Sequence, residues 1–240
     1  MTKKKVVASV VDSSGKKNSS NKPQAHLHPE FISKTAALII TDVQRDFMPG
    51  GALGVSGANF IIATVNQLIP QFRHILAVRD WHPPGHVSFA STHGKRTGEA
   101  VQVGNVEQIL WPDHCLQDSR GAELADGLQI EKIEAMFNKG TDLLVDRYSA
   151  FFDSQRHRST GLADFLHDHK IKDLYFVGVA TDYCILYSVL DALELGFKVT
   201  VILDACRAIN RRLGDEQRAV DAMKLKGAKI IHSEQLLRDS

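Results

Sequence analysis

The sequence predicts an α/β fold, with a doubly wound, mainly parallel sheet lying between two layers of helices. Two observations carry this prediction. From Thr35 onward, short apolar runs alternate with stretches whose apolar residues recur at helical spacing. The apolar runs are almost continuously hydrophobic, as expected for parallel strands that helices cover on both faces. In such folds ligands bind beyond the carboxyl ends of the strands, so functional residues are expected there.

The expected elements alternate along the chain, as the fold requires. The predicted strands are residues 36–41, 75–79, 174–179, 199–203 and 228–231. The predicted helices are residues 59–72, 162–169, 182–195 and 212–225. Gly196 directly follows the third helix, where a residue in the left-handed conformation commonly ends a helix.

The composition predicts one domain and excludes several functional classes. With 240 residues, 43% of them hydrophobic, the chain can bury one good core. A formal net charge of +1 gives no reason to expect nucleic acid or an anionic membrane as a partner. We find no apolar run of membrane-spanning length and no signal peptide. Three widely spaced cysteines do not form a disulfide framework, so a cytoplasmic setting is expected, and a homo-oligomer stays open.

The first 33 residues differ from the remainder in composition. Three consecutive lysines, Lys3 to Lys5, precede a Ser-, Lys- and Asn-rich stretch at 13–22 without periodic apolar positions. We predict a disordered basic and polar tail over 1–33 and a folded domain over 34–240. A targeting function is the alternative for the basic residues.

Cys184 is the candidate nucleophile. It follows the apolar run 174–180 and lies in the first turn of the helix predicted at 182–195. The unpaired N–H groups and the positive dipole end of a helix favour a thiolate there. They also favour an oxyanion on a substrate bound beside the thiol.

Asp42 directly follows the first predicted strand, at the carboxyl edge of the sheet. A carboxylate there is costly to desolvate unless it is paired or its pKa is raised. By its position alone, Asp42 is either a functional residue or a turn or capping residue, and both interpretations stay open. Asp46 is expected to be a local turn or salt-bridge residue.

The second strand ends in Asp80 and His82, which are two residues apart and therefore project to one face of an extended chain. Together they offer one oxygen and one nitrogen ligand, and a metal site needs a third. His114, in a Trp-Pro-Asp-His-Cys loop, is the best third ligand. Cys115 and Cys206 are expected to be core residues, although Cys115 is also a soft metal ligand in principle.

Lys139 precedes a glycine and by itself would be assigned to the surface. Near a thiol, however, its ammonium group would lower the pKa of the thiol and stabilise negative charge in acyl transfer.

Side by side, these segments resemble the nicotinamidases, also called pyrazinamidases, of the isochorismatase-like superfamily of cysteine hydrolases. The resemblance runs from about Thr35 to the C-terminus. Five motifs carry it in the family's order: IITDVQRDF at 39–47, RDWH at 79–82, WPDHC at 111–115, NKG at 138–140 and VATDYC at 179–184.

The resemblance implies an isochorismatase-like hydrolase fold and a role for each matching residue. The implied catalytic triad is Asp42, Lys139 and Cys184. The implied ligands of one divalent ion, most often Zn²⁺ with Mn²⁺ or Fe²⁺ as alternatives, are Asp80, His82 and His114. The implied oxyanion donors are the N–H groups of Ala180 and Cys184, beside a cis peptide that joins Val179 to Ala180. The implied walls of the ring pocket are Phe47, Trp111, Tyr148 and Tyr183.

The implied reaction is hydrolysis of nicotinamide to nicotinate and ammonia through a cysteine thioester, in NAD salvage. Pyrazinamide is expected to be accepted as well. His86 stays outside the metal set, because its spacing from His82 does not match every family member.

Three alternatives remain. A vinyl-ether hydrolase of the isochorismatase type would lack the nucleophile at Cys184 and the metal ligands. A metal-free amidase for carbamoyl or ureido substrates would keep the triad without those ligands. A non-catalytic binding protein on the same fold should have lost a triad residue, and none is missing.

Overall fold

The computed structural model describes residues 32–104, 106–153 and 158–237, so residues 1–31 of the predicted tail lie outside it. The centre of the fold is a six-stranded sheet of order β5-β2-β1-β6-β7-β8, in which all neighbouring strands are parallel. Its strands are β1 (Ala36–Thr41), β2 (His74–Asp80), β5 (Ala135–Lys139), β6 (Asp173–Val179), β7 (Lys198–Arg207) and β8 (Lys229–Ile231). The predicted doubly wound sheet is confirmed.

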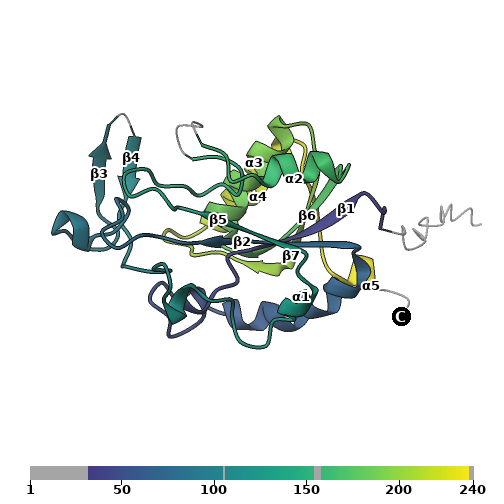
Figure 1. Cartoon of the computed structure of the whole chain (residues 1–240), viewed down its shortest axis with the longest axis horizontal. Coiled ribbons are helices and arrows are strands. Elements are labelled where there is room, and N and C mark those ends of the chain that lie inside the picture. Colours follow the sequence, from purple (N-terminus) through teal and green to yellow (C-terminus); the bar gives the residue numbers. More distant parts are fainter. Residues whose placement is uncertain (1–31, 105, 154–157, 238–240) are drawn as a thin grey trace, which may run out of the picture.

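Helices cover both faces of the sheet (Figure 1). They are α1 (Ile61–Leu68), α2 (Leu162–Asp168), α3 (Leu186–Glu194), α4 (Asp215–Leu225) and α5 (Glu234–Leu237). In the view of Figure 1, α1 and α5 lie below the sheet, and α2, α3 and α4 lie above it. The three layers are those that the sequence predicts.

Strand β1 explains why the sheet is covered twice. All six of its residues are buried, and their side chains alternate between two apolar cores. Leu38 and Ile40 pack in the core under α1, whereas Ile39 packs in the core that contains residues of α2, α3 and α4. A strand buried on both faces needs a continuous apolar sequence, which is the pattern that predicts it.

Element boundaries differ from the prediction where local chemistry intervenes. The helix predicted at 59–72 is an α-helix only over Ile61–Leu68 and has a 3₁₀ turn on either side. Pro70 lies in the second of these turns, where its missing N–H group interrupts the α-helical bonding. Strand β7 runs to Arg207, four residues further than predicted. Gly196 adopts the expected left-handed conformation, with a φ of 87°.

Two features were missed. A hairpin of β3 (Ala100–Val103) and β4 (Val106–Ile109) forms a separate two-stranded sheet that projects from the body (Figure 1). Strand β5 was not predicted. It lies at the edge of the sheet, where half-buried and exposed residues alternate, and so it lacks the continuous apolar run of a central parallel strand.

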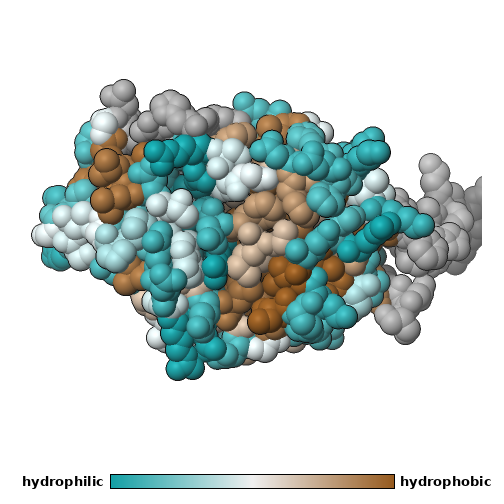
Figure 2. Space-filling view, viewed as in Figure 1, coloured by the Kyte–Doolittle hydropathy of each residue, from teal (hydrophilic) through white to brown (hydrophobic). Residues whose placement is uncertain are grey.

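On the surface, Figure 2 shows apolar residues gathered across the middle of one face. Exposed large apolar side chains of the chain include Ile130 and Met136, which lie just before and within the edge strand β5. Among the described residues, no helix has the length and apolar character needed to cross a membrane.

Candidate active site

Four neighbouring strands bring the predicted catalytic and metal-binding residues to one edge of the sheet. Asp42 directly follows β1, Asp80 ends β2, Lys139 ends β5, and Cys184 lies in the turn after β6. Because all four strands are parallel, their carboxyl ends lie at the same edge. Chain topology therefore assembles residues that are more than 140 positions apart in the sequence.

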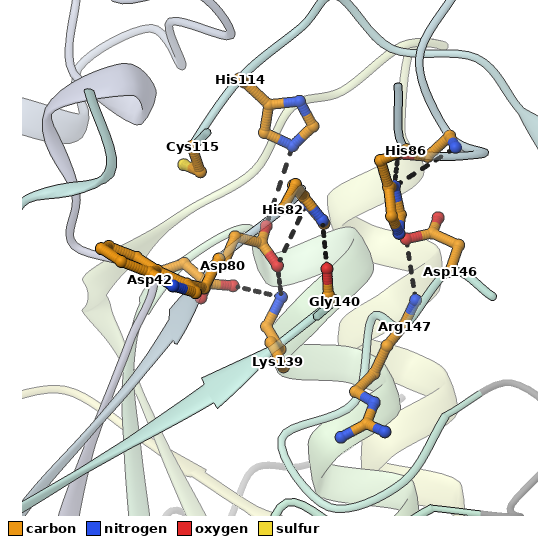
Figure 3. A network of polar contacts seen from close by, with 12 residues as sticks. Asp42, Asp80, His82, His86, His114, Cys115, Lys139, Gly140, Asp146 and Arg147 are labelled. Carbon is orange, nitrogen blue, oxygen red and sulfur yellow. Dashed lines mark hydrogen bonds and ion pairs between the residues drawn. The ribbon is translucent and has the colours of Figure 1, made fainter. Parts of the chain in front are cut away.

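The Lys139 ammonium group lies at the centre of this cluster (Figure 3). Its Nζ atom is 3.0 Å from Oδ2 of Asp42, 2.5 Å from Oδ1 of Asp80 and 3.4 Å from Sγ of Cys184. The side chains of Lys139 and Asp42 are fully buried. A buried lysine requires such compensation, because an isolated charge is far more costly in the interior than in water. The surface position suggested by the lysine alone is wrong.

Burial and neighbouring charges shift the pKa values of Asp42 and Asp80 in opposite directions. Burial raises the pKa of Asp42 to about 7, against the opposing effect of the Lys139 ammonium. For Asp80 burial acts in the same direction, but Lys139 and His82 outweigh it and hold the pKa of Asp80 well below its usual range. Both carboxylates in turn hold the pKa of Lys139 well above its usual range, despite its burial. Asp80 is thus an ionised partner, and Asp42 is able to exchange a proton near neutral pH.

Cys184 lies in a π-helical turn, Thr181–Ile185, which leads into α3. The preceding peptide, Val179–Ala180, is cis, as the resemblance implies. Burial raises the pKa of the Cys184 thiol well above its usual range, and the nearby Lys139 does not offset this. The net direction is opposite to that predicted from the helix N-terminus. The resting group is therefore a thiol that needs a base, and a carboxylate oxygen of Asp42 lies within 4.8 Å of its Sγ atom.

The predicted metal ligands converge beside the lysine. One ligand atom from each of Asp80, His82 and His114 lies within 4.8 Å of the other two, and all three residues are buried. Asp80 Oδ1 is 3.6 Å from Nε2 of His82, and its Oδ2 is 3.8 Å from Nε2 of His114. The Nδ1 atoms of the imidazoles pair with the carbonyls of Gly140 (2.9 Å) and Pro112 (2.8 Å). As donors to these carbonyls, the rings leave both Nε2 atoms free to bind a cation.

Gly140 is needed for this arrangement. Any Cβ atom at residue 140 would collide with the imidazole of His82, and the φ of 63° also favours glycine. The glycine of the Asn-Lys-Gly motif thus allows Lys139 and His82 to be close neighbours.

His86 and Cys115 flank the metal-binding group without belonging to it. The ring of His86 lies 4.2 Å from that of His82, centroid to centroid, and its Nδ1 is 2.7 Å from Oγ of Ser88. Cys115 is fully buried and packs in the apolar core with the residues around Phe47. Cys206 is buried in the other core, as expected.

One cavity holds the four predicted ring-pocket residues together with Cys184 and the three potential metal ligands. Trp111 and Tyr183 meet edge to face at 5.1 Å, and Nε1 of Trp111 donates a hydrogen bond of 3.0 Å to the hydroxyl of Tyr148. Phe47 lies 5.6 Å from the ring of His114. The structure thus brings all the predicted site residues together, while their roles stay predictions.

Sequence reasoning missed other residues near the cavity. Leu53 and Ile209 also line it, and they come from loops without a periodic signal. Gln44 and Asp46 form buried or half-buried bonds to the metal-binding segments, and Asp46 was expected to make only a local turn or salt bridge. The sequence signal was available, because both residues lie in the motif that follows β1.

The comparisons with known proteins agree with this architecture. Residues 36–235 match the family described as Isochorismatase domain. A nicotinamidase of Escherichia coli is 44% identical over 81% of this chain and 93% of its own length. A nicotinamidase of Acinetobacter baylyi is 42% identical over 85% of this chain and 96% of its own length.

Solved structures give the same result. A nicotinamidase/pyrazinamidase of Acinetobacter baumannii superposes with a TM-score of 0.83 at 39% identity, covering 85% of this chain and 99% of that one. A protein of L. infantum in complex with nicotinate has a TM-score of 0.75 at 34% identity, covering 85% and 96%. A Pyrococcus horikoshii pyrazinamidase in complex with zinc has a TM-score of 0.68 at 38% identity, covering 82% and 99%. The chain therefore belongs to the isochorismatase family.

Proposed function

We propose that this protein is a nicotinamidase, which hydrolyses nicotinamide to nicotinate and ammonia by way of a cysteine thioester. One observation carries the proposal: the buried ammonium of Lys139 contacts Asp42, Asp80 and Cys184, and Cys184 lines the same cavity as the group of Asp80, His82 and His114. The nicotinamidase relatives support the choice of substrate.

Asp42 is the general base. With a pKa of about 7, a substantial fraction of Asp42 is ionised near neutral pH, while its basicity is much greater than that of an exposed carboxylate. It accepts the proton of the Cys184 thiol, whose own pKa is raised by burial. Lys139 stays protonated and stabilises the negative charge that passes between sulfur and carboxylate.

In the acylation step, the proton that Asp42 took from Cys184 is passed on to the leaving nitrogen. The sulfur of Cys184 attacks the carboxamide carbon, and the N–H groups of Ala180 and Cys184 receive the developing oxyanion. Asp42 returns the proton to the nitrogen, the C–N bond breaks and ammonia leaves. Water attacks the resulting thioester while Asp42 takes a proton from it. The C–S bond breaks, Asp42 passes the proton to the sulfur to restore the thiol, and the acid product loses its carboxyl proton to solvent and leaves as nicotinate.

Asp80, His82 and His114 are the proposed ligands of a divalent ion. The donor set fits: one ionised carboxylate and two imidazoles, with each Nδ1 bonded to a backbone carbonyl, are typical of zinc and related metals. When bound, the ion would supply an electrophilic position for the ring nitrogen, directly or through its water, and so orient the carboxamide. The zinc-bound pyrazinamidase relative supports Zn²⁺, with Mn²⁺ and Fe²⁺ as alternatives.

The aromatic residues are proposed to hold the substrate ring. Phe47, Trp111, Tyr148 and Tyr183 line one cavity with the nucleophile, which suits a flat heteroaromatic amide. Such a pocket reads shape and one ring nitrogen, so pyrazinamide should also be accepted. The relative with bound nicotinate supports a product of this class. A role in NAD salvage follows from the reaction, and three free thiols fit the expected cytoplasmic setting.

Ammonia release tests the proposal. Purified protein should release ammonia from nicotinamide and pyrazinamide, and a chelator should slow this release until Zn²⁺ or Mn²⁺ is added back. Nicotinamide with a methyl group on its carboxamide nitrogen has the same ring but methylamine as the leaving group. Its rate of hydrolysis relative to nicotinamide shows how closely the site fits ammonia as the leaving group. Turnover of a ureido or carbamoyl substrate, combined with no turnover of nicotinamide, would overturn the proposal in favour of the metal-free amidase.

A further inference from the structure

The segment that follows β1 bonds to two parts of the chain that carry proposed metal ligands: the end of β2, with Asp80, and the loop that contains His114. Strand β1 pairs with β2 only as far as Thr41 and Val78, and the N–H of Asp42 adds one more bond of 2.9 Å to the carbonyl of Val78. Asp42 then turns the chain away with a φ of 52°. Strand β2 continues to Asp80 and so extends beyond its partner on this side.

Gln44 occupies the place that the missing strand would have filled. Its Oε1 accepts a hydrogen bond of 2.8 Å from the N–H of Asp80, and its Nε2 donates one of 2.8 Å to the carbonyl of the same residue. The carboxamide thus gives Asp80 one acceptor and one donor, which the backbone of a neighbouring strand would otherwise supply. Nε2 also donates to the carbonyl of Ala122 at 2.9 Å, and the Gln44 side chain is fully buried.

This pairing fixes Asp80, which contacts several other residues of the site. The Asp80 carboxylate contacts Lys139 through Oδ1 and lies between the imidazoles of His82 and His114. On its other side, Asp80 is in register with Lys139 of β5. With Gln44 in place, the end of β2 is held on both sides, although β1 has already left the sheet: Asp80 bonds to the Gln44 side chain, and the N–H of Trp81 donates to the carbonyl of Lys139 at 2.9 Å.

Asp46 acts on the second segment. Its Oδ2 accepts a hydrogen bond of 2.7 Å from the N–H of Cys115, the residue next to His114. The carbonyl of Cys115 in turn accepts a bond of 2.9 Å from the N–H of His82. The absence of a side chain at Gly121 makes room for the Asp46 carboxylate, because a Cβ atom there would collide with it.

We propose that Gln44 and Asp46 are positioning residues for the metal site, Gln44 through Asp80 and Asp46 through the turn that carries His114 and Cys115. The inference rests on the metal site of the proposed function. Neither residue needs to touch the ion. Residues that orient metal ligands in this way affect metal affinity although they do not coordinate the metal.

Metal titration of the purified protein tests the proposal. The apoprotein is titrated with Zn²⁺ against a chromophoric chelator, and with Co²⁺ while the visible absorption spectrum is recorded. Gln44→Met removes both bonds to Asp80 at similar side-chain length, and Asp46→Ala removes the acceptor for Cys115. Each should raise the Kd for Zn²⁺ by about 10- to 100-fold and change the Co²⁺ spectrum.

Two further variants separate positioning from general stability. Asp46→Asn keeps an oxygen acceptor and should restore the Kd to within about 3-fold of the parent, since one neutral hydrogen bond remains possible. Arg45→Gln is the matched control, because the Arg45 side chain instead forms ion pairs with Glu123 and Asp126. It should leave the Kd and the spectrum unchanged.

The outcomes are distinguishable. A parental Kd and spectrum in Asp46→Ala would overturn the proposal for Asp46, whether or not Gln44→Met folds, and the same result in folded Gln44→Met would overturn it for Gln44. An equal rise in the Kd for Zn²⁺ in Arg45→Gln would also contradict the proposal, because the weaker binding would then reflect general destabilisation of this segment. A parent protein that binds neither ion would instead overturn the metal site itself.

Discussion

The Nζ atom of Lys139 lies 3.0 Å from Oδ2 of Asp42, and both side chains are fully buried. This pair is central to the chemistry of the site. The Lys139 ammonium offsets part of the desolvation cost of a negative charge on Asp42 or on a neighbouring group in the protein interior. Burial nevertheless raises the pKa of Asp42 to about 7, so the pair can store and return a proton at neutral pH. A salt bridge that served stability alone would hold the pKa of its carboxylate low, as Lys139 does for Asp80.

Replacement of Cys184 should remove turnover and leave the fold intact. We expect Cys184→Ala to lower kcat for nicotinamide by a factor on the order of 10⁴ or more, as for other nucleophile deletions. Metal content and circular dichroism should match the parent. Cys206→Ala, which removes a buried thiol from the opposite core, is the control and should stay active. Near-parental activity of Cys184→Ala would exclude this residue as the nucleophile.

Removal of the buried ammonium should affect both stability and activity. Lys139→Met leaves Asp42 and Asp80 without their shared cation, so we expect a loss of about 3–5 kcal/mol in the free energy of unfolding, measured in urea. Activity should be lost as well. Lys198→Met is the matched control: its side chain is 85% exposed, and it should change stability by less than about 0.5 kcal/mol. Equal stability of the two variants would contradict the paired arrangement.

The pH dependence should report Asp42. As the proposed base, Asp42 must be ionised in the free enzyme, and its pKa is raised to about 7 rather than lowered. The value of kcat/KM for nicotinamide should therefore fall as the pH is reduced through about 7. Stopped assays from pH 5 to pH 8 at fixed ionic strength provide the profile. A profile that stays flat down to pH 5 would mean that another group is the base.

Metal retention should depend on His114. We expect His114→Ala to lose bound metal on gel filtration and the parent to retain it, because the substitution removes one of the three proposed protein ligands. Elemental analysis of the purified proteins measures this directly. His232→Ala, at an exposed position near the C-terminus, provides the comparison. Equal metal content in all three proteins would remove His114 from the ligand set.

The hydroxyl of Tyr148 should contribute to substrate binding by holding the wall of the pocket. It accepts a hydrogen bond of 3.0 Å from Nε1 of Trp111, which Tyr148→Phe would leave unpaired. The loss of one such bond corresponds to a rise in KM of about 2- to 10-fold. Tyr187→Phe is the control, since Tyr187 is 45% exposed and lies outside the cavity. An unchanged KM in Tyr148→Phe would show that the bond is not needed.

The sequence predicts much of this site because parallel strands deliver their carboxyl ends to one edge. Asp42, Asp80 and Cys184 each follow or end an apolar run that is easily recognised. Lys139 is different. Its strand β5 lies at the edge of the sheet, and the four residues before Lys139 alternate between half-buried and exposed, so a short local window does not reveal that the last residue is fully buried.

The remaining features depend on contacts that a local pattern does not encode. The bonding of Gln44 to Asp80 depends on how far β2 extends beyond β1, which is a property of strand pairing. The raised pKa of Cys184 depends on its burial, whereas the position near a helix N-terminus alone predicted a lowered value. The hairpin of β3 and β4 is short and partly exposed, and therefore lacks a continuous apolar run.

Trapping of the acyl-enzyme would show directly whether Cys184 forms a thioester with the substrate. Protein mixed with excess nicotinamide is quenched in acid within one turnover, digested and analysed by mass spectrometry. We expect a nicotinoyl group in thioester linkage on the peptide that contains Cys184, and no such adduct in Cys184→Ala. Release of ammonia from nicotinamide at the parental rate by Cys184→Ala, with no adduct on the parent, would contradict it.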